Sequence, residues 1–313
     1  CLDNFQRNGS LNNKKILLKK KKIKLIKFDC SKKFKNLGKY KFDLILHCAS
    51  DPSVNTDNNY KMFQSNLMST INLLEFASEQ KKKPIIVLFS SSRVYSINNL
   101  KKIKYKKNKS RLKILNYNKI DGLTKFGINE KFSATQIKSF YGSSKFSSEQ
   151  IFCEYSKKFS LPHIINRYGI ITGPRQLSTP SQGIFHFWLR SHIEGNNLCY
   201  TGFGGRGIQV RDAIDIEDVF KLLIKQLNKI NNCQNKVFNI GGGLKNTFSL
   251  RELTSMCNKI TGKHVKIKSV LKTHSFDVPF YVSDCTRFEK NFGKIKLKSI
   301  STMLKDIYLS LKS

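Results

Sequence analysis

The chain has 313 residues and carries 57 Lys and Arg against 21 Asp and Glu, which gives a formal net charge of +36. Hydrophobic residues make up 39% of the sequence and charged residues 25%, a composition that supplies a sizeable core and excludes a wholly disordered protein. No stretch of about 18 consecutive apolar residues is present, so the sequence predicts no membrane-spanning helix. The length fits one large α/β unit or two modest domains.

The positive charge comes in Lys-rich runs, at residues 14–24, 81–83 and 101–113. Such charge is compatible with a nucleic acid or an anionic membrane surface as a partner. The runs are scattered, however, and they lack both a nucleic-acid-binding motif and interleaved aromatic side chains for base stacking. We therefore interpret them as solvated faces and loops, and we expect no nucleic-acid partner. A substrate that carries a diphosphate is compatible with either interpretation.

The cysteines indicate neither a metal site nor a disulfide framework. None of them forms a Cys-x-x-Cys pair, and no His stands at the spacing of a zinc finger, so we predict no bound metal. The N-terminal segment lacks the apolar run of a signal peptide, and we therefore expect reduced thiols and a cytoplasmic location. The cysteines stand at 1, 30, 48, 153, 199, 233, 257 and 285.

Short, β-branched apolar segments at 23–28, 42–50, 84–92 and 162–169 are typical of strands buried in a parallel sheet. Helical periodicity separates them, which predicts βαβ units. The expected fold class is α/β, with a Rossmann-like doubly wound parallel sheet and a smaller α+β C-terminal domain. We place the domains at 1–165 and 166–313, with the alternative that about 208–243 returns to the first domain.

Two helices are expected to face this sheet. The second of them runs through Tyr141–Phe159 and places Phe152, Tyr155 and Phe159 on one face. The first lies between the second and third predicted strands, and its core-facing stripe is Phe63, Leu67, Ile71, Leu74 and Ala77.

The remaining segments are read from polarity and turn residues. Residues 96–140 are polar and Lys-rich, and we interpret them as a long excursion between a strand and the next helix. A helix is expected around Phe187, Trp188 and Leu189, and a last strand at 236–243. The next helix begins at Ser249, with Glu252 three residues later as a capping box.

One constellation points to chemistry. Tyr141 and Lys145 stand four residues apart, so both project from one helical face. A phenol with a pKa of about 10 is a poor base at neutral pH, and a neighbouring ammonium stabilises the phenolate. Serine hydroxyls at the end of the strand 84–92 complete the pattern, because one of them is able to hydrogen-bond the reacting oxygen.

With these motifs the chain resembles the extended short-chain dehydrogenase/reductase family, which contains nucleotide-sugar epimerases and dehydratases. Within that family it is most similar to the branch of CDP-paratose 2-epimerases. The resemblance covers essentially the whole sequence, and its motifs are DNF at 3–5, FDC at 28–30, HCAS at 47–50, SSSRVY at 90–95, YGSSK at 141–145, GPRQ at 173–176, SQG at 181–183, QVRD at 209–212 and FNIGGG at 238–243.

The resemblance implies an NAD-dependent enzyme and assigns roles to individual residues. Ser91, Tyr141 and Lys145 are the implied catalytic residues. Asp3 is expected to bind the adenosine ribose, which favours NAD over NADP, and Arg211 is expected to bind the substrate diphosphate. The implied cofactor-binding residues are Asp3, Asn4, Asp29, Cys30, Ala49, Ser50, Asn66, Tyr141 and Lys145, and the implied substrate-binding residues are Gln182, Gln209 and Arg211.

Simpler interpretations stand beside three of these roles. Asp3 is then an ordinary turn residue, Asn66 a polar group on a helix face, and Arg211 an ion-pair partner of Asp212. The resemblance also begins at the second strand of the family fold. We therefore expect that the glycine-rich turn that holds the NAD pyrophosphate is missing, and that NAD binding and activity of this chain are weak or absent.

Two further departures bear on the reaction. The resemblance implies a second phosphate-binding Arg near the C-terminus of the family proteins. The corresponding stretch of this chain reads His274-Ser275-Phe276-Asp277 and contains no Arg. The family's dehydratases carry an Asp-Glu pair directly after the catalytic hydroxyl, and here Ser92 and Arg93 follow Ser91.

The resemblance therefore implies an isomerase, a nucleotide-sugar epimerase that inverts C2 of CDP-paratose through a transient keto-sugar. The implied partners are a nucleotide-diphosphate sugar and further copies of the chain in a homo-oligomer. The alternatives are a UDP-sugar 4-epimerase, a dTDP-sugar 4,6-dehydratase, and a non-catalytic protein that binds polyanions.

Overall fold

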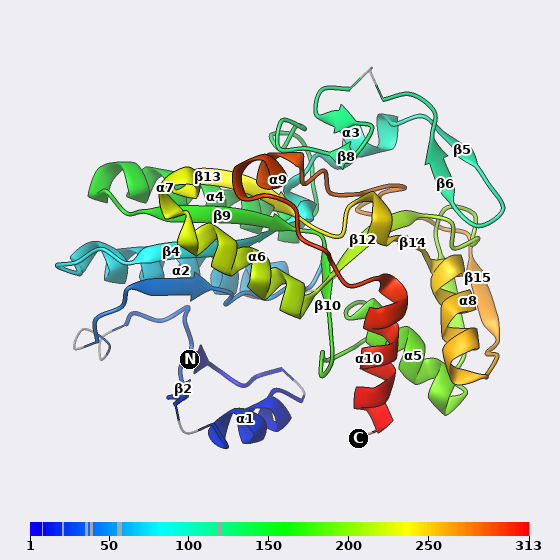
Figure 1. Ribbon diagram of the computed structural model, residues 1–313, viewed down its shortest axis with the longest axis horizontal. Coiled ribbons are helices and arrows are strands. Elements are labelled where there is room, and N and C mark those ends of the chain that lie inside the picture. The colour runs from blue at the N-terminus through cyan, green and yellow to red at the C-terminus, as the bar shows by residue number, and fades with distance from the viewer. Residues whose placement is uncertain are drawn as a thin grey trace. The chain divides into compact units, whose positions relative to one another are not determined.

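The computed structural model describes residues 1–7, 9–20, 22–34, 37, 40–54, 58–117 and 120–312. The chain divides into two compact units, and Figure 1 labels its helices and strands. Unit 1 contains residues 1–90, 140–166 and 234–236, and unit 2 contains 91–139, 167–233 and 237–313. Residues 91–139 thus belong with the C-terminal part of the chain, whereas the sequence-based division ran at 165. The assignment of a cofactor domain and a substrate domain to these parts stays a prediction.

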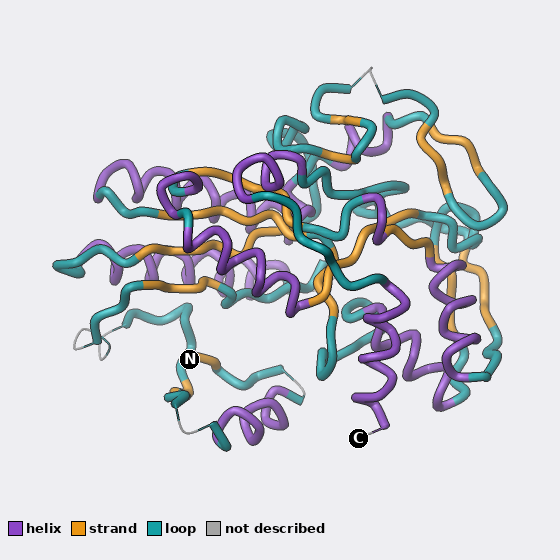
Figure 2. Tube along the Cα trace, in the orientation of Figure 1, coloured by secondary structure: helices purple, strands orange, loops and turns teal. Residues whose placement is uncertain are grey.

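A parallel sheet with helices characterises the first unit, and this confirms the predicted α/β class. Strand β3 pairs in parallel with β4, from Leu44 opposite Ile85 to His47 opposite Leu88, in a four-stranded sheet of order β13-β9-β4-β3. Figure 2 draws the strands of the chain in orange and its helices in purple. The elements that lie wholly or mainly in unit 1 are β1 (Leu2–Asp3), α1 (Ser10–Leu18), β2 (Ile26–Lys27), β3 (Leu44–His47), α2 (Asn59–Glu79), β4 (Ile85–Ser91), α4 (Phe140–Phe159) and β9 (His163–Tyr168).

The strand predicted at 23–28 is shorter than expected. Only Ile26 and Lys27 are extended as β2, and they pair in parallel with Leu2 and Asp3 of β1 in a separate two-stranded sheet. By contrast, β4 is buried at Ile86, Val87 and Leu88, as a run of β-branched and aliphatic residues in a sheet covered on both faces should be.

Helix α2 begins at the N-cap Asn58, whose side chain accepts the N–H of Lys61 at 2.9 Å. Its predicted stripe is wrong in the first half, because Phe63, Leu67 and Ile71 are half-buried. Polar side chains take the buried face instead, since they hydrogen-bond to α4 and β3. The buried residues of α2 are Met62, Asn66, Ser69, Thr70, Asn72, Leu73, Leu74, Phe76 and Ala77.

Unit 2 has its own apolar core between helices and short strands. Phe185, Trp188 and Leu189 of α5 pack with Leu253 of α8 and Leu304 of α10. The elements of unit 2 are η1 (Ser92–Val94), α3 (Ile97–Lys102), β5 (Tyr105–Lys107), β6 (Leu112–Ile114), β7 (Leu123–Thr124), β8 (Gly127–Ile128), β10 (Ile170–Thr172), α5 (Ile184–Glu194), β11 (Leu198–Thr201), β12 (Val210–Asp215), α6 (Ile216–Asn228), α7 (Ile230–Cys233), β13 (Lys236–Ile240, which starts in unit 1), η2 (Leu244–Asn246), β14 (Thr247–Ser249), α8 (Leu250–Thr261), β15 (Ile267–Val270), α9 (Thr286–Phe292) and α10 (Ile300–Lys312).

As predicted, the segment 96–140 lies between strand β4 and helix α4, but its described residues are not all loop. The segment forms α3 and the antiparallel pairs β5–β6 and β7–β8. Leu112 packs in one apolar cluster with Ile208, Val210 and Val282. These elements were not predicted from the Lys-rich sequence, because each of them contributes only one or two side chains to the core.

The predicted start of α8 is confirmed. The Ser249 hydroxyl accepts the N–H of Glu252 at 3.1 Å, and the Glu252 carboxylate accepts the N–H of Ser249 at 3.0 Å, as a capping box requires. Across the part of the chain that the structure describes, no helix is long and apolar enough to cross a membrane.

Candidate active site

The predicted catalytic pair lies on the buried face of α4. Tyr141 stands in the first turn of this helix, and Lys145 follows one turn later. Glu149 continues the same face after a further turn. The side chain of Lys145 is 3% exposed and that of Glu149 is 1% exposed. The helix therefore presents a phenol, an ammonium and a carboxyl group in one buried row.

Burial lowers the pKa of Lys145 from 10.5 to about 8, and the nearby Cys48 and Glu149 oppose this change. The amine is still mostly protonated at pH 7 but releases its proton far more readily than a lysine in water. Such a cation favours the phenolate form of a neighbouring tyrosine, because an opposite charge stabilises the ionised state.

Asn66 joins α2 to the loop after β3 and to α4. Its side-chain oxygen accepts the N–H of Asp51 at 2.6 Å, and its amide nitrogen donates to the Asp51 carbonyl at 3.1 Å and to Ser144 Oγ at 2.9 Å. The loop it holds contains Ala49 and Ser50. The structure thus brings these three predicted residues together within unit 1, and Asn66 holds the loop against α4 by hydrogen bonds.

A second polar contact lies one turn along the same pair of helices. Thr70 donates to Ser148 Oγ at 3.1 Å, and its hydroxyl also meets His47 Nε2 at 3.0 Å. Burial, followed by the charge of Lys145, lowers the pKa of His47 to about 3. His47 is therefore neutral at physiological pH and adds no positive charge beside Lys145.

The residues predicted to hold adenosine also come together. Asp3 ends β1 and Asp29 follows β2, and these two strands run parallel. Burial, and then the charges of Asp29 and Asp3, raise the pKa of the Cys30 thiol to about 11, so both carboxylates lie near Cys30. Asn4 follows Asp3 directly. Carboxylates at the carboxyl ends of parallel strands suit the hydroxyl groups of adenosine, so these residues fit the adenosine half of NAD.

Ser91 is the last residue of β4 and the first residue of unit 2. Its hydroxyl accepts the N–H of Arg93 at 3.2 Å and caps the short helix η1. The preceding Ser90 is buried, and its hydroxyl donates to the Glu149 carboxylate. The structure thus gives Ser90 a structural bond within unit 1, and leaves Ser91 as the predicted catalytic hydroxyl.

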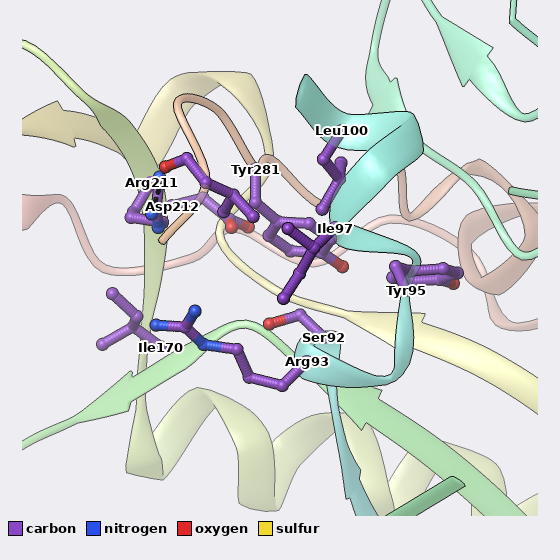
Figure 3. Close-up of a pocket in the computed structure, with 10 residues that line it drawn as sticks. Ser92, Arg93, Tyr95, Ile97, Leu100, Ile170, Arg211, Asp212 and Tyr281 are labelled. Carbon is purple, nitrogen blue, oxygen red and sulfur yellow. Dashed lines mark hydrogen bonds between the residues drawn. The ribbon is translucent and has the colours of Figure 1, made fainter. Parts of the chain in front are cut away.

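A pocket within unit 2 holds the predicted substrate residue Arg211 (Figure 3). The Arg211 guanidinium donates to the carbonyl oxygens of Val210, at 2.8 Å, and Val278, at 2.6 Å. Its neighbour Asp212 instead accepts the N–H of Gly243 at 3.1 Å. This unit 2 pocket has a volume of about 70 Å³ and is lined by Ser92, Arg93, Tyr95, Ile97, Leu100, Ile170, Arg211, Asp212, Val278 and Tyr281.

The two predicted glutamines lie elsewhere in unit 2. Gln182 exchanges backbone hydrogen bonds with Thr179 in a tight turn before α5. Gln209 donates to the Thr201 carbonyl at 3.4 Å, and its side-chain oxygen is buried without a hydrogen-bond partner among the described residues. Neither glutamine lines the unit 2 pocket. Their substrate-binding roles stay predictions.

Sequence reasoning assigned no site role to five polar residues of this pocket, namely Ser92, Arg93, Tyr95, Asp212 and Tyr281. Arg93 lies two positions after Ser91, and Asp212 directly follows Arg211. Their closeness in sequence to predicted site residues was the signal that could have identified them. Burial raises the pKa of Asp212 to about 6. Among the described residues, no group of three or more His, Cys, Asp or Glu is placed to hold a metal ion.

Sequence comparison places the chain among sugar-nucleotide enzymes. A model of the NAD dependent epimerase/dehydratase family matches residues 2–241. The chain is 28% identical over 259 residues to the CDP-paratose 2-epimerase of Salmonella typhi, a match that covers 80% of this chain and 73% of that protein. It is 24% identical over 277 residues to UDP-glucuronate 4-epimerase 2 of Arabidopsis thaliana, covering 84% of this chain and 57% of that one. The chain thus spans little more than half of the plant relative.

Solved structures share the fold. The UDP-glucuronic acid 4-epimerase of Bacillus cereus, in complex with UDP-glucuronic acid and NAD, aligns with a TM-score of 0.79 at 24% identity, over 99% of this chain and 90% of that one. The dTDP-glucose 4,6-dehydratase of Bacillus anthracis, in complex with NAD, aligns with a TM-score of 0.74 at 20% identity, over 99% and 86%. At these identities the likeness establishes the Rossmann-type architecture.

Proposed function

Because the chain belongs to the NAD dependent epimerase/dehydratase family, we propose that it is a nucleotide-sugar epimerase that inverts C2 of CDP-paratose. The observation that carries this proposal is the buried row of Tyr141 and Lys145 on α4, with Lys145 holding a pKa of about 8. NAD is the cofactor of the family, and the Asp3 and Asp29 carboxylates suit its adenosine end.

In the proposed reaction Tyr141 takes the proton of the C2 hydroxyl. The Lys145 ammonium stabilises the phenolate form of Tyr141 that accepts this proton, so that this base is available at neutral pH. NAD, when bound, supplies the hydride acceptor at C2 and later the hydride donor. After the keto-sugar has turned, Tyr141 returns the proton to the oxygen, and Ser91 donates a hydrogen bond to that same oxygen.

The residues after Ser91 favour epimerisation over loss of water. A dehydratase needs an acid to protonate the departing hydroxyl. Here Ser92 and Arg93 follow Ser91 and line the unit 2 pocket, and Asp212 is the carboxyl group in the described lining. Arg93 does not donate a proton at neutral pH, because a guanidinium remains protonated.

The sugar is assigned from the Salmonella typhi relative, since it matches over 73% of its length. A second candidate is UDP-glucuronate, inverted at C4, because UDP-glucuronate 4-epimerases of Arabidopsis thaliana also match at 24% and 23% identity. Both candidates use the same row on α4, and they differ in the base and in the sugar group that the substrate residues must hold.

The experiment incubates the purified protein with NAD and either CDP-paratose or UDP-glucuronate in D₂O, and follows the sugar protons by NMR. We expect conversion of CDP-paratose to its C2 epimer without deuterium at C2, because the hydride returns from the cofactor. Tyr141→Phe serves as the inactive control. Conversion of UDP-glucuronate alone would replace the first candidate by the second, and deuterium at C2 would indicate enolisation. Conversion of neither, by protein that calorimetry shows to bind NAD, would overturn both.

A further inference from the structure

Arg93 enters the unit 2 pocket from the turn that follows β4. Its peptide N–H is bound to Ser91 Oγ at 3.2 Å, and its Nη1 donates to the Phe276 carbonyl at 3.2 Å. Figure 3 shows the side chain reaching from this turn into the pocket, toward the side where Ile170 and Arg211 lie. The backbone and the guanidinium of Arg93 are thus each held by a hydrogen bond.

The pocket brings this guanidinium close to that of Arg211. Burial, and then the charge of Arg93, lower the pKa of Arg211 to about 9, and Asp277 and Asp212 oppose that change. Like charges at short range in a poorly solvated site repel each other. The hydrogen bonds from Arg93 to Phe276 and from Arg211 to Val210 and Val278 end on carbonyl oxygens and orient the two guanidiniums.

The chemistry of the lining selects an oxyanion as the group that fits here. A guanidinium presents a planar fork of N–H donors, which matches the oxygen pairs of phosphates and carboxylates. The volume of about 70 Å³ is far below the ~300–1,000 Å³ of pockets for whole ligands. The pocket therefore suits one charged group of a larger molecule, with Ile97 and Leu100 as its apolar wall.

We propose that Arg93 is a substrate-binding residue that holds, together with Arg211, an oxyanion of the nucleotide sugar. This proposal rests on the proposed function and names the group that the pocket recognises. The position of Arg93 is favourable, because Ser91 caps the same turn and the anion is then fixed beside the predicted catalytic hydroxyl. Phe276, which anchors Arg93, also lies in the stretch 274–277, where the family resemblance implied an arginine that this chain replaces by His274.

The oxyanion has two possible sources on a nucleotide sugar, namely the diphosphate or a carboxylate on the sugar. Calorimetric titration of wild type and Arg93→Gln separates them. The probes are inorganic pyrophosphate, CDP, UDP-glucose and UDP-glucuronate, of which the last two differ in the sugar carboxylate. If the diphosphate is bound, Arg93→Gln weakens all four probes by about 10- to 100-fold, the range for a charged hydrogen bond. If the carboxylate is bound, the variant weakens UDP-glucuronate alone.

Two further variants complete the design. Arg190→Gln removes the same charge from an exposed ion pair with Glu194 in unit 2 and should leave every dissociation constant unchanged. Arg93→Lys keeps the charge without the planar fork and should restore part of the affinity, which a loss of folding would not allow.

The outcomes distinguish this proposal from the proposed function. Wild-type affinity of Arg93→Gln for every probe that the wild type binds would overturn the role of Arg93 and leave the epimerase assignment intact. Pyrophosphate binding that depends on Arg93, in a protein that converts no nucleotide sugar, would support the anion site and overturn the assigned reaction. A wild-type protein that binds none of the four probes would overturn the anion site.

Discussion

The hydroxyl of Ser90 donates to the carboxylate of Glu149, and both side chains are buried. Ser90 directly precedes Ser91 at the end of β4, and Glu149 lies one turn after Lys145 on α4. One hydrogen bond therefore joins the strand end to the helix that carries the predicted catalytic pair, and its acceptor is the carboxylate that helps to keep Lys145 protonated.

We predict that Glu149→Gln lowers the pH at which activity is lost on the alkaline side. The amide still accepts the Ser90 hydroxyl, but it no longer stabilises the Lys145 ammonium, so the pKa of Lys145 should fall below about 8. The measurement is kcat as a function of pH, because a purely structural role of Glu149 would not shift the alkaline decrease in kcat. Glu154→Gln, on an exposed position of the same helix, is the control. An unchanged limb would contradict the coupling.

Tyr141→Phe should leave the fold intact and reduce kcat by about 10²–10⁴-fold, the usual contribution of a general acid–base group. The phenyl ring keeps the buried shape and removes the hydroxyl that exchanges the proton. Tyr155→Phe is matched to it on the same helix, because that hydroxyl donates to Glu75 away from the row, and it should retain activity. Near-normal turnover of Tyr141→Phe at unchanged melting temperature would remove Tyr141 from the mechanism.

Wild-type activity should fall above pH 8 as Lys145 loses its proton. Burial lowers the pKa of this amine to about 8, so the ammonium is mostly present at pH 7 and mostly absent at pH 9. Lys145→Arg keeps a charge at high pH, and any activity it retains should lack this limb. Lys157→Arg, exposed on the same helix, should keep the limb in place. A wild-type profile that stays flat to about pH 9.5 would contradict the assignment.

The row on α4 was predictable because it depends on local spacing. Tyr141 and Lys145 are four residues apart, and helical geometry alone puts them on one face. The capping box of Ser249 and Glu252 was predictable for the same reason. These features need no knowledge of distant partners.

The hydrogen bonds between polar side chains of α2 and α4 were not predictable, since the partners are far apart in sequence. Asn66 meets Ser144, and Thr70 meets Ser148, each across 78 residues. Apolar periodicity therefore assigned the buried face of α2 to Phe63 and Leu67, which are half-buried. A pattern rule treats polar residues as outward-facing and misses those that pair with each other inside a core.

Arg93 illustrates a third case, in which the residue was visible but its surroundings were not. The sequence places it two residues after Ser91, and only the fold adds Arg211 and the Phe276 carbonyl, which follow it by more than a hundred residues. The glycines of the FNIGGG motif belong here as well. A Cβ at Gly241 would come within 2.3 Å of the Asp212 carboxylate, so this glycine makes room for a buried acid.

That acid gives the last prediction, which concerns stability. The free energy of unfolding of wild type relative to Asp212→Asn should fall as pH rises from about 4 to 7. Burial raises the pKa of Asp212 from 3.8 to about 6 in the folded state. Between these values the folded protein holds the proton that the unfolded chain has lost, so rising pH favours unfolding.

The change amounts to about 3 kcal/mol at most, on the scale of 1.36 kcal/mol for each pKa unit, and it is measured by urea denaturation across the pH range. Asp43→Asn is the control of opposite sign, because the hydrogen bond from Lys82 lowers the pKa of Asp43. Its contribution is lost as pH falls rather than as pH rises, and exposure keeps it small. The prediction fails if the difference in free energy of unfolding between wild type and Asp212→Asn does not vary from pH 4 to 7. Asp212 then has an ordinary pKa in the folded state, and its ionised carboxylate faces Arg93 and Arg211 in the unit 2 pocket.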